Sequence, residues 1–279
     1  MLRWRFLFLL LLAWAGFASA QTPAVLKMGV FPYLSPSQLI EQQEPLRRYL
    51  EATLGRPVVM SSAPDFPSFV KRTQQGEYDL VVTAPHMARL AQKRDGWQAV
   101  AMSAQQTATT IIVQKDSTIG RLEDLRGKRL AVGSRYSVTY LLAEEALGKR
   151  GLKLGRDVLV QETASFSNVL QSVLVGEVEA GATPTLLWDN WVHANAEQRA
   201  KLREIYRAPP PNPHSFFVMM PPATPAAAVA KLREALLAWN ETPEGRDFLH
   251  KSQFLSFVAP TEKAMARSDP FVHVLIEDK

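Results

Sequence analysis

Hydroxyl side chains gather where apolar, strand-like runs give way to helical patterns. Such a turn places a side-chain oxygen beside the unpaired N–H groups and the positive dipole end of a helix, a combination that binds oxyanions. Ser and Thr are also the ordinary N-cap residues, so each turn taken alone indicates a cap more often than a ligand site. Four such turns favour an oxyanion site if they meet at one place. Their polar residues are Tyr33, Ser35 and Ser37; Thr83 and His86; Ser134, Ser137 and Thr139; Thr183 and Thr185.

Motifs for hydrolytic, metal-dependent or nucleotide chemistry are missing from the sequence. It contains no G-x-S-x-G elbow, H-E-x-x-H helix, Walker loop or G-x-G-x-x-G turn, and no two histidines stand four residues apart. The absence of cysteine excludes a thiolate metal site and a cysteine nucleophile. Glu144 and Glu145 are sequence neighbours, which do not face one site on a helix. We therefore expect a protein that is not an enzyme and uses no metal or cofactor; an exported hydrolase is the alternative.

The turns belong to an alternation of strands and helices that occurs twice. The first set has strands at 25–30, 57–61 and 78–82 and helices from 36, over 66–75 and after Thr83, which would cap the third helix. The second set has strands at 109–114, 129–132, 158–161 and 179–182 and helices over 139–151, 166–175 and from 184. This order predicts an α/β fold of two lobes, each a mixed, mainly parallel sheet covered by helices. Ligands of such sheets bind beyond the carboxyl ends of the strands, so the four turns should face one cleft.

A late strand indicates how the two lobes are connected. Residues 214–220 form an apolar run after the proline-rich stretch 208–213, and helices follow to the C-terminus. We expect the chain to cross between lobes at strands 109–115 and 215–222. Lobe 1 would comprise residues 24–112 plus 217–279, and lobe 2 residues 113–216. A ligand that touches both lobes would favour their closed arrangement.

The first twenty residues are typical of a secretory signal peptide. Arg3 and Arg5 precede an apolar run that ends in Ala18-Ser19-Ala20, which predicts cleavage before Gln21. Removal of residues 1–20 leaves 30 Lys and Arg against 27 Asp and Glu, a net charge of +3. A nucleic-acid partner is disfavoured, because phosphate backbones require dense Lys and Arg clusters that this chain lacks. We expect a monomer in the periplasm.

Five segments together resemble the phosphate/phosphite/phosphonate-binding family of type II periplasmic solute-binding proteins, the receptors of ABC importers. The resemblance extends over about residues 25 to 260, and DLRGKRLAVG and GEVEAGA are its most specific parts. The segments are LRRYLEATLGRPV, GEYDLVVTAPHMARLA, LEDLRGKRLAVGSRYSVTYLLAEEAL, LVGEVEAGATPTLLWDNW and LREALLAWNETPEGRDFL.

The resemblance implies which residues contact the ligand. The family's Ser-Thr-Ser-Gly anion loop corresponds to Ser137-Val138-Thr139-Tyr140, which keeps two of three hydroxyls. Phe166 stands where family members often carry a histidine, which indicates a more apolar or aromatic-bearing ligand. The other candidates by position are Tyr33, either an aromatic wall or hydroxyl donor or else a core or rim residue; Thr83; His86, either a ligand contact or a surface residue; and Thr183. Trp188 or Asp189 would also face the cleft, the latter either as a ligand for an amino group or as a solvated helix charge.

The function implied by the resemblance is capture of a small oxyanion in the interlobe cleft. The protein would then deliver this ligand to an ABC permease in the inner membrane. The alternative is a periplasmic protein that presents its ligand state to a membrane sensor kinase, because one fold serves both roles.

Overall fold

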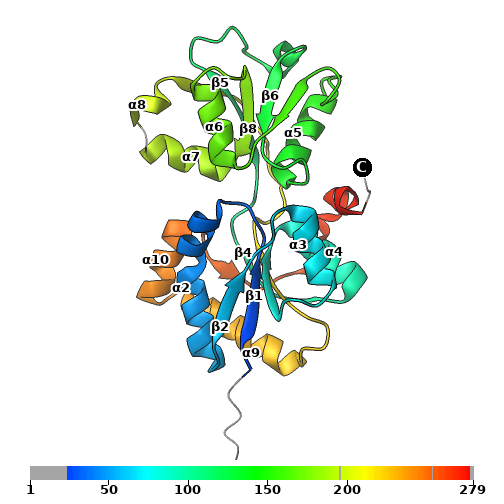
Figure 1. Ribbon diagram of the computed structural model, residues 1–279, viewed down its shortest axis with the longest axis vertical. Helices are drawn as coiled ribbons and strands as arrows, with labels where there is room; N and C mark the ends of the chain where they lie inside the picture. Colours follow the sequence, from blue (N-terminus) through cyan, green and yellow to red (C-terminus); the bar gives the residue numbers. More distant parts are fainter. Residues whose placement is uncertain (1–23, 195, 253, 277–279) are drawn as a thin grey trace, which may run out of the picture.

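Two separate sheets divide the chain into two α/β lobes (Figure 1). The computed structural model describes residues 24–194, 196–252 and 254–276. The predicted signal peptide therefore lies outside the described residues. Among the helices of the described residues, none has both the length and the apolar character needed to cross a membrane. Two mixed sheets with helices on their faces confirm the α/β class expected from the sequence.

The sheet of the first lobe has six strands in the order β11-β4-β10-β3-β1-β2. Strand β1 pairs in parallel with both β2 and β3, and β10 runs antiparallel between β3 and β4. Apolar clusters fill both faces of the sheet, one under α2, α9 and α10 and the other under α3, α4 and α11. The strands are β1 (Leu26–Val30), β2 (Val58–Ser61), β3 (Leu80–Thr83), β4 (Gln98–Ser103), β10 (Phe217–Met220) and β11 (Phe257–Val258). The helices are α2 (Pro36–Leu54), α3 (Phe66–Gln74), α4 (Pro85–Asp95), α9 (Ala226–Trp239), α10 (Pro243–Ser252) and α11 (Glu262–Ala266).

The second lobe is built on a five-stranded sheet in the order β7-β6-β8-β5-β9. Strand β6 is parallel to β7 and β8, and β5 is antiparallel to β8 and β9. Its strands are β5 (Thr109–Gln114), β6 (Arg129–Val132), β7 (Leu159–Glu162), β8 (Ala180–Pro184) and β9 (Leu202–Arg207). Its helices are η1 (Leu122–Leu125), α5 (Val138–Gly148), α6 (Phe166–Leu174), α7 (Thr185–Ala194) and α8 (Ala196–Arg199).

The chain passes between the two sheets twice, after β4 and after β9. The two passages run antiparallel: Thr107 N–H donates to the Pro213 carbonyl (2.8 Å), and Ser215 N–H donates to the Gln105 carbonyl (2.8 Å). Strand β5 pairs along its whole length within the second sheet, so residues 109–112 lie with the second lobe and the first passage ends before residue 109. The lobe limits at residues 112 and 216 stay a prediction. The pairing of β5 would move the first of these limits from residue 112 to about residue 108.

Two details of the helix starts differ from the sequence-based expectation. Thr83 is the last residue of β3, and Ala84 is the N-cap of α4. The prediction that Thr83 caps this helix was therefore wrong. Ser35 is the N-cap of α2, but its hydroxyl donates to Gln38 Oε1 (2.8 Å) rather than accepting from the helix backbone. The cause at Thr83 is strand pairing, because Phe217 of β10 is its partner in the sheet.

The C-terminal segment touches both lobes. Two short 3-10 turns, η2 (Asp269–Phe271) and η3 (His273–Leu275), follow α11 of the first lobe. Their Phe271 and Val274 pack against an apolar face of α5 in the second lobe, and Figure 1 shows this red segment beside the passage between the lobes. Asp269 holds the segment to α4, because its carboxylate accepts two hydrogen bonds from Arg89 (2.7 and 3.2 Å).

Candidate functional site

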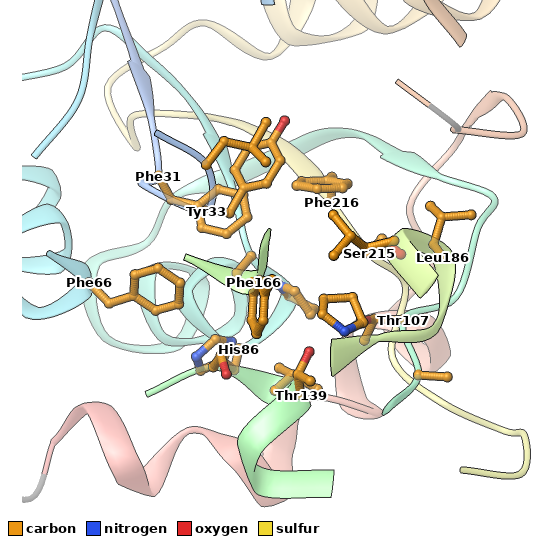
Figure 2. A pocket seen from close by; sticks show the side chains of 18 of the residues that line it. Phe31, Tyr33, Phe66, His86, Thr107, Thr139, Phe166, Leu186, Ser215 and Phe216 are labelled. Atoms are coloured by element: carbon orange, nitrogen blue, oxygen red, sulfur yellow. The ribbon is translucent and has the colours of Figure 1, made fainter. Parts of the chain in front are cut away.

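A cavity of about 880 Å³, counted to its opening into solvent, lies between the lobes at the carboxyl ends of the parallel strands. Figure 2 shows its walls, which come from both lobes and from the passages between them. Among the described residues that line it, none is Asp, Glu, Lys or Arg. The lining comprises Phe31, Tyr33, Leu34, Gln42, Phe66, Ala84, Pro85, His86, Thr107, Ala108, Ser137, Val138, Thr139, Phe166, Pro184, Leu186, Leu187, Ser215, Phe216 and Ser252.

Three helices line this cavity with two consecutive residues of their first turn. They are α4 in the first lobe (Pro85 and His86) and α5 and α7 in the second (Val138 and Thr139; Leu186 and Leu187), whereas α3 and α6 contribute only the rings of their first residues. The N–H groups in the first turn of a helix have no partner within the helix, and they carry its positive dipole end. Pro85 contributes no N–H to α4, so the second lobe supplies more of these donors. The free N–H groups at these three helix N-termini, which come from both lobes, can together bind one anion.

Ser137 and Thr139 lie at the start of α5 and have different roles. The Ser137 hydroxyl is the N-cap and accepts a hydrogen bond from Tyr140 N–H (3.1 Å). Thr139 is buried and lines the cavity, and Figure 2 places its hydroxyl on the cavity side. We find no hydrogen-bond partner for this hydroxyl within the described residues. Thr139 therefore offers the freer donor, next to the backbone N–H groups of Val138 and Thr139.

His86 is fully buried in the cavity wall and links the lobes. Its Nε2 lies 2.8 Å from the carbonyl oxygen of Tyr136, in the turn before α5. Burial lowers the pKa of His86 to about 4, against a smaller opposing effect of this hydrogen bond. The ring is therefore neutral at pH 7, and because a carbonyl can only accept, Nε2 carries the proton. Nδ1 is then a bare acceptor, and it has no partner among the described residues.

Aromatic rings form much of the remaining wall. The Phe31 and Tyr33 rings stack at a centroid distance of 4.7 Å, and Phe216 lies 5.4 Å from Phe31 and 5.1 Å from Tyr33. Phe66 meets Phe31 edge to face at 5.7 Å. The Tyr33 hydroxyl donates to Gln42 Oε1 (2.8 Å) and accepts from Gln43 Nε2 (2.9 Å). Burial raises the pKa of Tyr33, so this residue presents a neutral ring rather than a free hydroxyl.

Phe166 stands between this cavity and a second one. Its ring lies against Gly133 at the end of β6, where a Cβ would be only 2.5 Å from Phe166 Cε1. Glycine at that position lets the ring lie flat over the backbone. The second cavity, of about 950 Å³ to its opening, is the more polar, since it is lined by Asp65, Ser134, Glu162, Thr163 and Ser165 among others.

The structure brings six of the eight sequence-predicted site residues together: Tyr33, His86, Ser137, Val138, Thr139 and Phe166. The other two, Thr83 and Thr183, are buried in β3 and β8 and do not line the cavity. Trp188 packs in the apolar cluster around α6. Asp189 is bound by Arg207, whose Nη1 and Nη2 lie 2.9 and 2.7 Å from its oxygens, so it is a paired helix charge outside both cavities.

Several lining residues were not among the sequence-based candidates. Phe31 directly follows β1, and Phe66 is the first residue of α3, so both occupy strand-to-helix turns, where only polar side chains were predicted to contact a ligand. Phe216 precedes an antiparallel strand, whose amino end reaches the edge formed by the carboxyl ends of its neighbours. Thr107, Ser215 and Leu186 come from the passages and from α7. Phe31 and Phe66 could have been predicted from their position between a strand and a helix, if residues of every type had been considered there.

Comparisons with known proteins identify the family and the fold. The family of ABC transporter phosphonate periplasmic substrate-binding proteins matches residues 28–265, and the chain belongs to it. PhnD1 from Prochlorococcus marinus, solved with methylphosphonate, is 16% identical with a TM-score of 0.80 over 90% of this chain and 98% of that one. A binding protein component of an ABC phosphonate transporter from Pseudomonas aeruginosa is 17% identical, with a TM-score of 0.78 over 90% and 86%.

A sensor protein shares the same general fold at a greater structural distance. A histidine kinase sensor domain with similarity to periplasmic binding proteins is 17% identical to this chain, with a TM-score of 0.56 over 85% of this chain and 98% of its own. At these identities the solved structures show the fold alone. The family is one of periplasmic solute-binding proteins rather than enzymes, which agrees with the expectation from the missing catalytic motifs.

Proposed function

We propose that this protein captures a small oxyanion of the phosphate, phosphite or phosphonate class in the interlobe cavity and delivers it to an ABC permease of the inner membrane. The single observation that carries the proposal is the meeting of three helix N-termini from both lobes at one cavity. Helix N-termini bind oxyanions through free N–H groups and the helix dipole. Membership of the phosphonate-binding family supports the same ligand class and the permease partner.

Ligand capture would proceed by closure of the lobes. The anion accepts hydrogen bonds from α5 and α7 of one lobe and from α4 of the other, and all three contacts form together only when the lobes are close. Binding therefore shifts the equilibrium toward the closed form by the difference in ligand affinity between the two forms. The closed form would be the species that the permease recognises. The weaker match of the sensor domain gives no specific reason to prefer a sensor role.

Export follows from the same proposal. The periplasmic family and the sequence of residues 1–20 support cleavage of a signal peptide before Gln21. N-terminal sequencing of the protein from a periplasmic extract is expected to begin within a few residues of Gln21. A product that retains Arg3 would contradict this part of the proposal.

Thermal-shift measurements on the mature protein test the ligand class. Phosphate, phosphite and methylphosphonate are compared at equal concentration with chloride and with an amino acid. A ligand that binds only the native state raises the melting temperature, by the equivalent of about 2.7 kcal/mol at a hundred times its Kd. We expect a rise with at least one of the three phosphorus oxyanions. No rise with any of them, alongside a rise with the amino acid, would contradict the proposal.

A further inference from the structure

We propose that the ligand is an oxyanion that carries an aromatic or branched apolar group, and that this group lies among the rings of Phe31, Tyr33, Phe66, Phe166 and Phe216. The inference rests on the proposed function and makes its ligand class narrower. Inorganic phosphate and methylphosphonate would then be poor ligands, and phosphonates with an aryl group good ones.

Three aromatic rings of the cavity wall are not fully covered by the apolar core. Tyr33, Phe166 and Phe216 stay only partly buried, although each comes from a different element: the turn after β1, the start of α6 and the passage before β10. All three line the cavity. Figure 2 shows Phe166 opposite the Phe31, Tyr33 and Phe216 group, with open space between them. Rings that face one another across a cavity offer a surface on which an apolar or aromatic group gains by leaving water.

The described residues of the cavity wall offer an anion little charge compensation. No ionised side chain lies among the described lining residues, so an anion in this cavity is balanced only by helix N-termini and hydroxyls. One of the three helices begins with Pro85, which lacks an N–H, and the buried Nδ1 of His86 is an acceptor that cannot bind a bare anionic oxygen. The phosphate or phosphonate group itself would lose much solvation here for few donors, and inorganic phosphate has no apolar group whose burial would offset that loss. The cavity therefore suits a ligand whose affinity comes in large part from apolar burial.

Phe166 lies between this cavity and the second one, where the acidic side chains of Asp65 and Glu162 lie. The ring thereby keeps carboxylates away from the ligand and adds an apolar surface from the lobe opposite Phe31 and Tyr33.

Calorimetric titration of the mature protein with phenylphosphonate, methylphosphonate and inorganic phosphate tests the inference. We expect phenylphosphonate to bind at least tenfold more tightly than methylphosphonate, and phosphate to bind no better than methylphosphonate. Methylphosphonate or phosphate binding as tightly as phenylphosphonate would overturn the inference and leave the proposed function standing. Binding of none of the three, and no binding of phosphite in the same titration, would overturn both.

A variant of Phe166 tests the placement of the apolar group. In Phe166→Ala we expect the preference for phenylphosphonate over methylphosphonate to fall to less than about threefold, with methylphosphonate affinity changed by less than threefold. Phe166→His, which keeps a ring but adds polar atoms, should lower the same preference. This variant keeps the test decisive if the alanine variant does not fold. Val175→Ala is the matched control, because Val175 is exposed at the other end of α6 and lines neither cavity. An unchanged preference in both Phe166 variants would overturn the placement.

Discussion

Thr139 is the residue whose hydroxyl distinguishes ligand binding from helix capping. Its neighbour Ser137 accepts the Tyr140 N–H, a bond typical of an N-cap serine, whereas the buried Thr139 hydroxyl faces the cavity with no partner within the described residues. The sequence could place both at the start of a helix, but it could not separate their roles. That separation depends on which way each side chain points.

Replacement of Thr139 by valine should weaken oxyanion binding. The change keeps the shape of the side chain and removes one hydrogen bond to a charged ligand, which is worth about 1.5–3 kcal/mol, or roughly ten- to a hundredfold in Kd. Calorimetric titration with a phosphonate measures the loss. An affinity within twofold of the unaltered protein would show that this hydroxyl does not touch the ligand.

Ser137→Ala should act mainly on stability. Loss of an N-cap hydroxyl costs about 1 kcal/mol, which urea unfolding can detect. Thr261→Ala is a matched control, because Thr261 caps α11 in the same way, accepting from Ala264 N–H (3.2 Å), and does not line the cavity. The two variants should lose similar stability. A stability unchanged in Ser137→Ala would contradict the capping role.

His86 should make the protein less stable as the pH falls from about 6.5 to 4. The folded-state pKa, lowered to about 4 by burial, lies below the unfolded value near 6.5, so the unfolded chain binds the extra proton within this window. The stabilising effect is fully present above pH 6.5 and is lost as the pH falls. Carboxylates such as Asp157 and Asp269, whose pKa is lowered to about 2 by their Arg partners, act only at still lower pH.

Urea unfolding between pH 7.5 and 4.5 checks this expectation. The unaltered protein should lose about 1–3 kcal/mol over that range, since one pKa unit corresponds to about 1.4 kcal/mol. In His86→Asn, which removes the titrating ring, the loss should be clearly smaller. An identical pH dependence in both proteins would assign the effect to other groups.

At the scale of elements, the apolar runs with helices between them were sufficient to predict most strands and their order. Strands β4, β9 and β11 were not predicted, and the expectation that only helices follow residue 220 was wrong at β11. Strand β4 (QAVAMS) is rich in alanine, which has little strand preference, and β9 (LREIYR) is an edge strand of which half the residues are charged. Both pair antiparallel with distant segments, and such long-range pairing leaves little local signal. The same reason explains why Phe216 was missed as a cavity residue.

Asp269 of the C-terminal turn η2 forms ion pairs with two residues of α4, Arg89 (2.7 Å) and Lys93 (2.9 Å), beside the apolar packing of the segment. Arg89 is buried, and Asp269 is its main partner beside Glu262. Asp269→Ala should therefore cost about 1–2 kcal/mol in urea unfolding, less than for a fully buried pair because Asp269 is partly exposed. Asp247→Ala, which breaks an exposed pair with Lys251 on α10, should change stability by less than about 0.5 kcal/mol. Equal effects of the two changes would contradict this role of Asp269.

At the scale of the whole molecule, the lobes are joined by two antiparallel passages, by packing of the C-terminal segment and by the hydrogen bond between His86 and Tyr136. Small-angle scattering of the mature protein should show a smaller radius of gyration with a saturating phosphonate than without it. Thr139→Val at the same ligand concentration should show a smaller decrease, because less protein is bound. A radius unchanged at proven saturation would exclude lobe closure as the response to ligand.

The central claim is that one oxyanion is held where α4, α5 and α7 begin. A crystal structure of the protein with bound phenylphosphonate tests it most directly, because phosphorus and oxygen positions can be read from the density. The claim predicts phosphonate oxygens within hydrogen-bond distance, about 2.7–3.2 Å, of the N–H groups of Val138 or Thr139 and of the start of α7. A phosphonate in the second cavity, beyond Phe166 and beside Asp65 and Glu162, would contradict it.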